Sequence, residues 1–174
     1  ATVKASFGDT DFGRGCLVAS RLVEKGARFV EVVLDGWDTH QNNFERVAKL
    51  MSVLDPAMSA LVSDLEKKNL LASTLILVMG DFGRTPKINA NDGRDHFPAC
   101  STAVLAGGGI RGGVVYGETD SEGAKVTKDP VAIADLFATA ATLLGMNPHE
   151  EVISPIGRPI TLTDNGAALR TLIS

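Results

Sequence analysis

Apolar residues recur along this chain with two different spacings, and the spacing separates predicted helices from predicted strands. Between residues 44 and 65, seven apolar residues follow one another at intervals of three and four, which places them on one face of a long helix. They are Phe44, Val47, Met51, Leu54, Met58, Leu61 and Leu65. Pro56 is expected to kink or split this helix, because proline removes a hydrogen bond from the helical ladder. We therefore predict a long helix whose apolar face packs into a core.

Two shorter helices are predicted from the same spacing and from their end signals. Residues 12–25 carry apolar side chains at helical intervals, and the stretch ends at Gly26, a residue type that commonly follows the last helical turn. Residues 131–144 form a second apolar face, and the preceding Asp129 and Pro130 suit an N-cap and a first helical turn. Both stretches are therefore predicted to be helices that contribute to a core.

Short continuous apolar runs alternate with these helices and are typical of buried strands. The clearest runs are residues 28–34, 74–79 and 102–106, and the proline-rich tail adds an edge strand at residues 159–162. Because strands and helices alternate, we expect an α/β fold, a three-layer sandwich with a mainly parallel sheet. Neither a repeat nor an interdomain linker interrupts the pattern, so residues 1–174 are predicted to form a single domain.

Composition and charge narrow the class of protein. Hydrophobic residues make up 44% of the chain and charged residues 22%, which is typical of a globular protein. The net charge of −4 gives no reason to expect a nucleic-acid partner or an anionic membrane surface. No apolar run approaches the roughly 20 residues of a membrane span, so none is predicted. Cys16 and Cys100 are interpreted as small buried hydrophobes, and their spacing does not establish a disulfide.

The candidate chemistry lies in loops that follow the predicted strands. Asp38 and His40 follow the first strand, Asp81 follows the second, and Asp95 directly precedes His96 farther along the second loop. In open α/β sheets ligands bind beyond the carboxyl ends of the strands, so these side chains could converge at one edge. Imidazole and carboxylate ligands suit Zn²⁺ or a similar transition ion. The sequence therefore predicts a metal site.

Two arginines suggest what such a site would act on. A bound metal can polarise a phosphoryl or sulfuryl oxygen and lower the pKa of bound water to about 7. Arg84 and Arg94 could clamp an anionic group by paired hydrogen bonds. Other interpretations remain open, because the Asp residues could cap turns, the His residues could bond to the backbone, and Arg84 could form a surface ion pair. The glycine run at residues 107–113 lacks the Gly-Lys-Ser/Thr ending of a phosphate-binding loop and is predicted to be a turn.

Four ordered motifs of the chain resemble those of the bacterial family catalogued as domain of unknown function 1501. They are Gly36 to His40, Met79 to Pro86, Gly93 to Pro98 and Leu105 to Gly113. The resemblance extends from about Phe12 to Leu172. That family looks like a branch of the alkaline phosphatase and sulfatase superfamily, whose members hydrolyse phosphate or sulfate esters at a metal site above a parallel sheet. The resemblance therefore implies an alkaline-phosphatase-like fold.

The resemblance also implies roles for individual residues. Asp38 and His40 resemble the superfamily's ligands of one metal, and His96 resembles that metal's later histidine. Asp81 resembles a ligand of a second metal, but Phe82 replaces the histidine that follows this aspartate in the superfamily. The resemblance thus implies one or two ions of Zn²⁺ or a similar divalent transition metal.

The resemblance leaves the catalytic nucleophile unassigned. Nothing before Phe12 resembles the superfamily's nucleophilic Ser or Thr, so the chain looks like the carboxyl-terminal portion of longer relatives. If it is a fragment, it should possess a partial copy of their fold, and if it is complete, any hydrolysis must run through metal-bound water. We expect a metal-dependent hydrolase domain acting on a small anionic phosphate or sulfate ester. Two alternatives are a non-catalytic metal- or substrate-binding domain that retains the scaffold, and an α/β interaction domain without metal. A periplasmic or exported location is implied by the resemblance alone.

Overall fold

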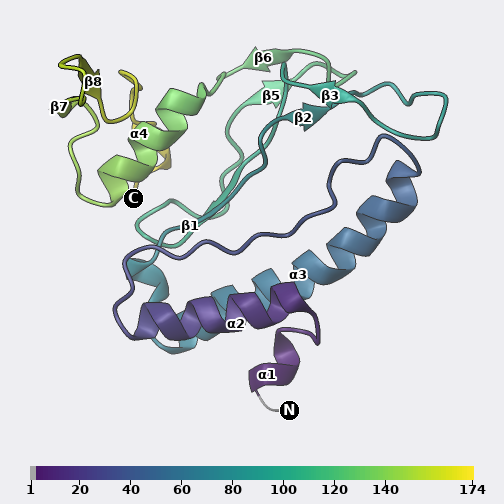
Figure 1. Ribbon diagram of the computed structural model, residues 1–174, viewed down its shortest axis with the longest axis horizontal. Coiled ribbons are helices and arrows are strands. Elements are labelled where there is room, and N and C mark those ends of the chain that lie inside the picture. The colour runs from purple at the N-terminus through teal and green to yellow at the C-terminus, as the bar shows by residue number, and fades with distance from the viewer. Residues whose placement is uncertain (1–2) are drawn as a thin grey trace. The chain divides into compact units, whose positions relative to one another are not determined.

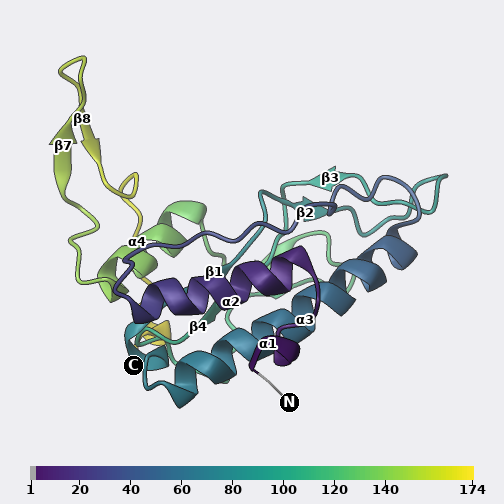
Figure 2. The ribbon, with the colours of Figure 1, turned by 60° about the horizontal axis from the view of Figure 1, so that its bottom comes forward.

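Helix α2 (Asp11–Glu24) and helix α3 (Asn43–Lys67) lie side by side (Figures 1 and 2), after a short helix α1 (Val3–Ser6). They are seen in a computed structural model that describes residues 3–174. The side chain of Thr10 caps α2 by accepting a hydrogen bond from the Gly13 N–H at 3.0 Å. Both helices predicted in this region are therefore confirmed, and α3 runs through Pro56 without splitting.

The apolar face of α3 is only partly buried. Leu61 and Leu65, near its carboxyl end, are buried, whereas Phe44 and Met51 are 62% and 43% exposed. The buried residues of α2 are Phe12, Gly13, Cys16, Ala19 and Ser20. The seven-residue stripe predicted for core packing therefore serves that purpose only in the second half of the helix.

Contacts along the chain divide it into two compact units. The first unit contains the described residues up to Thr74 together with residues 82–101, and the second contains residues 75–81 and 102–174. The single domain predicted for residues 1–174 is not tested by this division and stays a prediction. Within the part of the chain that the structure describes, no helix is both long and apolar enough to cross a bilayer.

The strands pair locally into two-stranded antiparallel sheets. In the first unit, β2 (Gly83–Arg84) pairs with β3 (His96–Phe97), and Arg84 lies opposite His96. In the second unit, β1 (Ile76–Val78) pairs with β4 (Val104–Ala106), β5 (Glu118–Thr119) with β6 (Val126–Lys128), and β7 (Glu151–Ile153) with β8 (Pro159–Thr161). Two 3₁₀ turns, Leu71–Ser73 and Arg170–Leu172, complete the elements among residues 3–174.

The predicted α/β three-layer sandwich with a mainly parallel, alkaline-phosphatase-like sheet is wrong. Every sheet described in residues 3–174 is two-stranded and antiparallel. Parallel pairing needs a crossover connection, usually a helix, and the chain between β1 and β4 contains none. Residues 28–34 form no strand in the described structure, and Phe29 and Val33 are 84% and 65% exposed. Apolar runs indicate strand-like stretches, but they do not specify a partner or its direction.

Helix α4 (Ile133–Leu143) begins later than predicted. Its N-cap is Ala132 rather than Asp129, because Asp129 has a left-handed φ of 45° whereas an N-cap residue adopts an extended conformation. The carboxyl-terminal tail packs closely against this helix: a Cβ on Gly166 would lie 2.0 Å from the Ala134 carbonyl oxygen. The tail therefore lies against α4 at this point, and Figure 2 shows the β7–β8 hairpin extending away from the helix.

Candidate metal centre

The loop that leads into α3 places Asp38 and His40 on the same side. Thr39, between them, is 1% exposed, and its Oγ1 donates a hydrogen bond at 2.6 Å to Oδ1 of the buried Asn43. In extended chain, successive side chains point in opposite directions, so burial of Thr39 leaves both of its neighbours facing outward together. The buried threonine therefore orients two of the predicted metal ligands.

The β2–β3 hairpin brings His96 to these two residues. The loop of this hairpin is fastened to the chain around His40 by backbone contacts, including a hydrogen bond of 3.0 Å from the Arg94 N–H to the Thr39 carbonyl oxygen. The approach requires glycine at position 93, because a Cβ there would lie only 1.9 Å from the His40 carbonyl oxygen. Two segments distant in sequence are thereby held side by side within the first unit.

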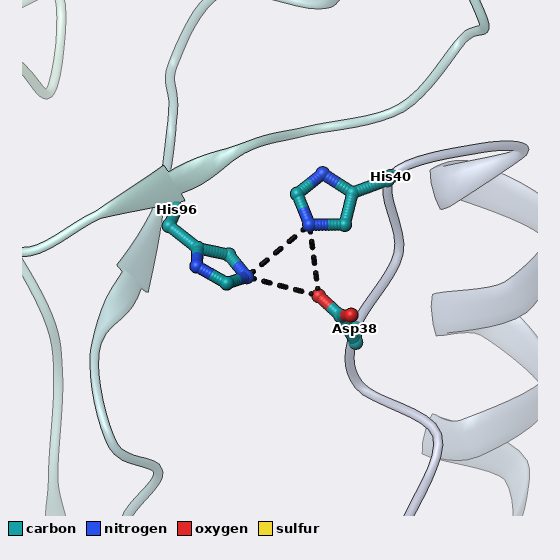
Figure 3. Close-up of side chains that lie close together, drawn as sticks. All are labelled: Asp38, His40 and His96. Carbon is teal, nitrogen blue, oxygen red and sulfur yellow. Dashed lines mark hydrogen bonds and ion pairs between the residues drawn. The ribbon is translucent and has the colours of Figure 1, made fainter.

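The ligand atoms of Asp38, His40 and His96 converge in a small triangle (Figure 3). Oδ1 of Asp38 lies 3.1 Å from Nε2 of His40 and 3.1 Å from Nε2 of His96. The two Nε2 atoms are 3.2 Å apart. The side chains are 67%, 43% and 50% exposed, respectively, so the triangle remains open to solvent.

The size of this triangle fits a transition-metal ion. Tetrahedral Zn²⁺ with bonds of about 2.0–2.1 Å holds its ligand atoms about 3.3 Å apart, close to the observed separations. Two imidazole nitrogens and one carboxylate oxygen also form a ligand set that zinc and related ions accept, and three protein ligands leave a coordination position for water or substrate. The residues present therefore fit such an ion.

Neighbouring side chains keep the carboxyl groups of Asp38 and Asp95 ionised. A hydrogen bond from Arg84, another from His96 and the nearby His40 lower the pKa of Asp38 to about 2. The pKa of Asp95 is also lowered, chiefly by a hydrogen bond from His40 and then by one from Asn89. Both carboxylates are therefore negatively charged at neutral pH, as a cation site requires.

The two predicted substrate arginines differ in their surroundings. Arg84 lies beside the triangle, and its Nη2 donates to Oδ1 of Asp38 at 2.7 Å. The two N–H groups on Nη1 of Arg94 donate to the carbonyl oxygens of Thr85 and Pro86 at 2.6 and 2.8 Å, so this nitrogen has no N–H group left for a substrate. Substrate binding by Arg84 and Arg94 stays a prediction, and the geometry favours Arg84.

The remaining predicted ligand, Asp81, is not part of the triangle. It belongs to the second unit, whereas the three converging residues belong to the first, so its role at a second metal stays a prediction. Phe82 belongs to the first unit and packs against the ring of His96, with centroids 4.4 Å apart and an interplanar angle of 47°. Phe82 thus supports the ring of a candidate metal ligand.

Two further residues of the site were not assigned a role from the sequence. Asp95, which precedes His96, instead lies with Oδ1 2.9 Å from Nδ1 of His40, and Asn89 donates to the same carboxylate oxygen at 3.0 Å. The spacing of Asn89 and Gly93 is a usable signal, because an asparagine side chain often bonds the backbone of a following turn. Nothing in the local sequence indicates that Asp95 reaches the other histidine.

The site is an exposed cluster of two histidines and one aspartate whose ligand atoms have the spacing of a single metal site. The chain matches the family model described as protein of unknown function (DUF1501) over residues 1–173, and it therefore belongs to that family. No curated protein and no solved structure shows a match.

Proposed function

We propose that this chain binds one divalent transition-metal ion, Zn²⁺ or a similar one, through Asp38, His40 and His96. We further propose that the centre hydrolyses small phosphate or sulfate esters, as in the alkaline phosphatase and sulfatase superfamily that the sequence resembles. This relationship is proposed for the metal ligands and not for a parallel sheet, which the described structure lacks.

The convergence of the three ligand atoms is the observation that carries the proposal. An oxygen and two ring nitrogens lie within 3.2 Å of one another, on side chains from two segments of the chain. Two imidazole lone pairs and a carboxylate directed at one point repel one another unless protons or a cation lie between them. The arrangement is thus better explained by a cation than by turn capping, for which these side chains would have to bond to the backbone.

The surrounding residues suit an anionic ester. When bound, such an ion polarises a phosphoryl or sulfuryl oxygen and lowers the pKa of water to about 7. Arg84 presents its guanidinium beside the ligand triangle, where it can pair with a phosphate or sulfate oxygen. The exposure of the triangle leaves room for a small substrate to approach.

A non-catalytic metal- or substrate-binding role is the second candidate, and the hydroxyl groups near the site favour it. Thr39 and Thr85 are the hydroxyl-bearing residues of the two loops that flank the ligands. Oγ1 of Thr39 donates to Asn43, and Oγ1 of Thr85 donates to the Lys87 carbonyl oxygen at 2.8 Å. Both hydroxyl protons are therefore engaged in hydrogen bonds within the protein. Turnover of a substrate therefore separates the two candidates.

The first experiment is a metal measurement on the chain purified without a His tag. We expect about one ion per chain, detected by plasma mass spectrometry after incubation with Zn²⁺, Mn²⁺ or Fe²⁺. The double variant His40→Ala/His96→Ala should lose it. His149→Ala is the matched control, since it removes an exposed histidine outside the first unit and should retain the ion.

A screen of aryl phosphates and aryl sulfates then tests the chemistry. Turnover that requires the added ion and disappears in the double variant would support hydrolysis. Stoichiometric metal without turnover would support the non-catalytic role. Failure of the wild-type chain to take up any of the ions would contradict both metal-dependent hydrolysis and a metal-binding role.

A further inference from the structure

The two ring nitrogens of His40 face different neighbours. Nε2 lies 3.1 Å from Oδ1 of Asp38 and 3.2 Å from Nε2 of His96, whereas Nδ1 lies 2.9 Å from Oδ1 of Asp95. Both nitrogens therefore face a carboxylate oxygen, which when ionised can only accept a hydrogen bond. The contact with Asp95 is the shorter one, and metal binding through Nε2 requires a lone pair on that atom, so the ring proton of His40 is assigned to Nδ1.

Asp95 is itself held in place from two directions. Nδ2 of Asn89 donates to Oδ1 of Asp95 at 3.0 Å and also to the carbonyl oxygen of His40 at 3.1 Å. The backbone N–H of Asp95 donates to Oγ1 of Thr85 at 3.0 Å. The side-chain amide of Asn89 therefore holds both the carboxylate of Asp95 and the main chain of His40.

The position of Asn89 is fixed by its own loop. Its Oδ1 accepts hydrogen bonds from the backbone N–H groups of Asn91 and Gly93, both at 2.9 Å. Its side chain thus closes the turn on one side and reaches His40 and Asp95 on the other. The contacts that support the ring of His40 are thus made by residues of the loop itself.

We propose that Asp95 is a positioning residue that fixes the tautomer and orientation of His40 for metal binding, and that Asn89 holds Asp95 for this task. This proposal rests on the proposed metal site, and it identifies Asp95 and Asn89 as residues that raise the affinity of that site for the metal ion. A metal-bound histidine commonly donates its other N–H to a carboxylate, and loss of that partner weakens metal binding by about 10–100-fold. Neither residue touches the ion or the substrate in this arrangement.

Zinc affinity of three variants, measured by competition with a chromophoric chelator, tests the proposal. Asp95→Ala removes the acceptor and should weaken Zn²⁺ binding by about 10–100-fold. Asp95→Asn retains an acceptor oxygen without the charge and should fall between Asp95→Ala and the wild type. Asp35→Ala is the matched control: it removes an exposed carboxylate in the loop before Asp38, and its affinity should equal that of the wild type.

Nitrogen-15 NMR of the metal-free chain provides a readout that a merely structural role would not change. In the wild type, His40 should carry its proton on Nδ1. Asp95→Ala should give a mixture of tautomers, whereas Asp95→Asn should restore the proton to Nδ1. Asn89→Asp retains the acceptor for the turn but removes the donor to Asp95, and its zinc affinity should also fall. Circular dichroism of each variant verifies that α2 and α3 remain folded.

The outcomes separate this inference from the proposed function. If Asp95→Ala binds zinc as tightly as the wild type and its His40 retains the proton on Nδ1, the inference is overturned while the metal site stands. If the wild type takes up no ion, the proposed function fails. A tautomer that changes in Asp95→Ala would then still support the part of the inference that concerns His40, and an unchanged tautomer would overturn that part as well.

Discussion

Two clusters of charged side chains lie in the same unit of this chain, and they differ in burial and in composition. Between α2 and α3, Oδ2 of Asp64 accepts hydrogen bonds from Ser20 at 2.5 Å and from Lys68 at 2.7 Å. Ser20 is fully buried, and the side chains of Asp64 and Lys68 are only 11% and 20% exposed. The three ligand side chains of the candidate metal centre are 43% to 67% exposed.

The comparison shows how two groups of polar residues on one scaffold can be told apart. In the helix cluster, Lys68 donates to Asp64, to Ser20 at 3.0 Å and to Glu24 at 2.9 Å, so its three N–H groups all have acceptors. At the candidate metal centre, a carboxylate oxygen and two imidazole nitrogens lie within 3.2 Å of one another. The first arrangement ties two helices together, whereas the second has the geometry of a metal-ligand set. Each of the following predictions tests one side of this contrast.

The largest expected effect is the loss of metal binding in Asp38→Ala. This change removes one of the three proposed protein ligands, so zinc affinity should fall by more than the roughly 10–100-fold that loss of an outer hydrogen-bond partner costs. Since the Asp38 side chain is 67% exposed, the free energy of unfolding of the metal-free chain should change little. Chelator competition and urea unfolding measure the two quantities. A large loss of stability without loss of affinity would reverse the roles assigned to the two clusters.

Asp64→Ala should have the opposite profile. It leaves Lys68 and Ser20 without their shared acceptor between the helices, which should lower the free energy of unfolding by about 1–3 kcal/mol. Zinc affinity at a temperature where the chain is folded should be unchanged. Asp55→Ala, on an exposed position of the same helix, should alter stability by no more than about 0.5 kcal/mol. Equal effects of the two substitutions would show that the buried network contributes nothing.

Arg84→Ala should weaken recognition of an anionic ester by about tenfold, which is the lower end of the effect of a charge-assisted hydrogen bond. If the chain hydrolyses an aryl phosphate, KM should rise more than kcat falls. Arg94→Ala is the informative comparison, because Arg94 donates to the backbone carbonyls of Thr85 and Pro86 and its loss should lower stability instead. An unchanged KM in Arg84→Ala would show that Arg84 does not bind the substrate.

The smallest expected effect is a contribution of the helix cluster to acid sensitivity. Burial raises the pKa of Asp64, but hydrogen bonds from Lys68 and Ser20 outweigh burial, so that its pKa is lowered overall. Because the folded-state pKa lies below the unfolded-state value near 3.8, this stabilisation is present above about pH 4 and is lost as the pH falls through the folded-state pKa. Urea midpoints of Asp64→Asn should therefore fall less steeply below about pH 4 than those of the wild type. An identical pH dependence of the urea midpoints in the two proteins would show that ionised Asp64 does not stabilise the fold.

Most of α2 and α3 and the shared direction of Asp38 and His40 could be predicted because their signals are local. The apolar spacing and the stop at Gly26 specify α2, and the stripe that ends at Leu65 specifies most of α3. The pair of Asp38 and His40, two residues apart, indicates a shared direction in extended chain. These patterns depend on neighbours a few residues away, and residue spacing records such neighbours well.

The sheet and the support of His40 could not be predicted because they depend on distant partners. Apolar content identifies residues 28–34 as strand-like but does not specify what they pair with. In the same way, Asp95 is adjacent to His96 in sequence but contacts His40. His96 pairs with Arg84 in the hairpin, and the side chain of Asp95 points toward His40 instead. Only the folded loop reveals that contact.

The separation of the ligands along the chain has a consequence for how this unit holds together. Asp38 and His40 are neighbours in any conformation, but His96 follows His40 by 56 residues. An ion that joins all three closes a long loop, and an unfolded chain must give up much conformational freedom to close it. The ion would therefore act as a reversible cross-link that favours the folded state, by about 2.7 kcal/mol when free metal is 100 times its dissociation constant. The concentration of free metal would then set the folding stability of this unit as well as its occupancy by the ion.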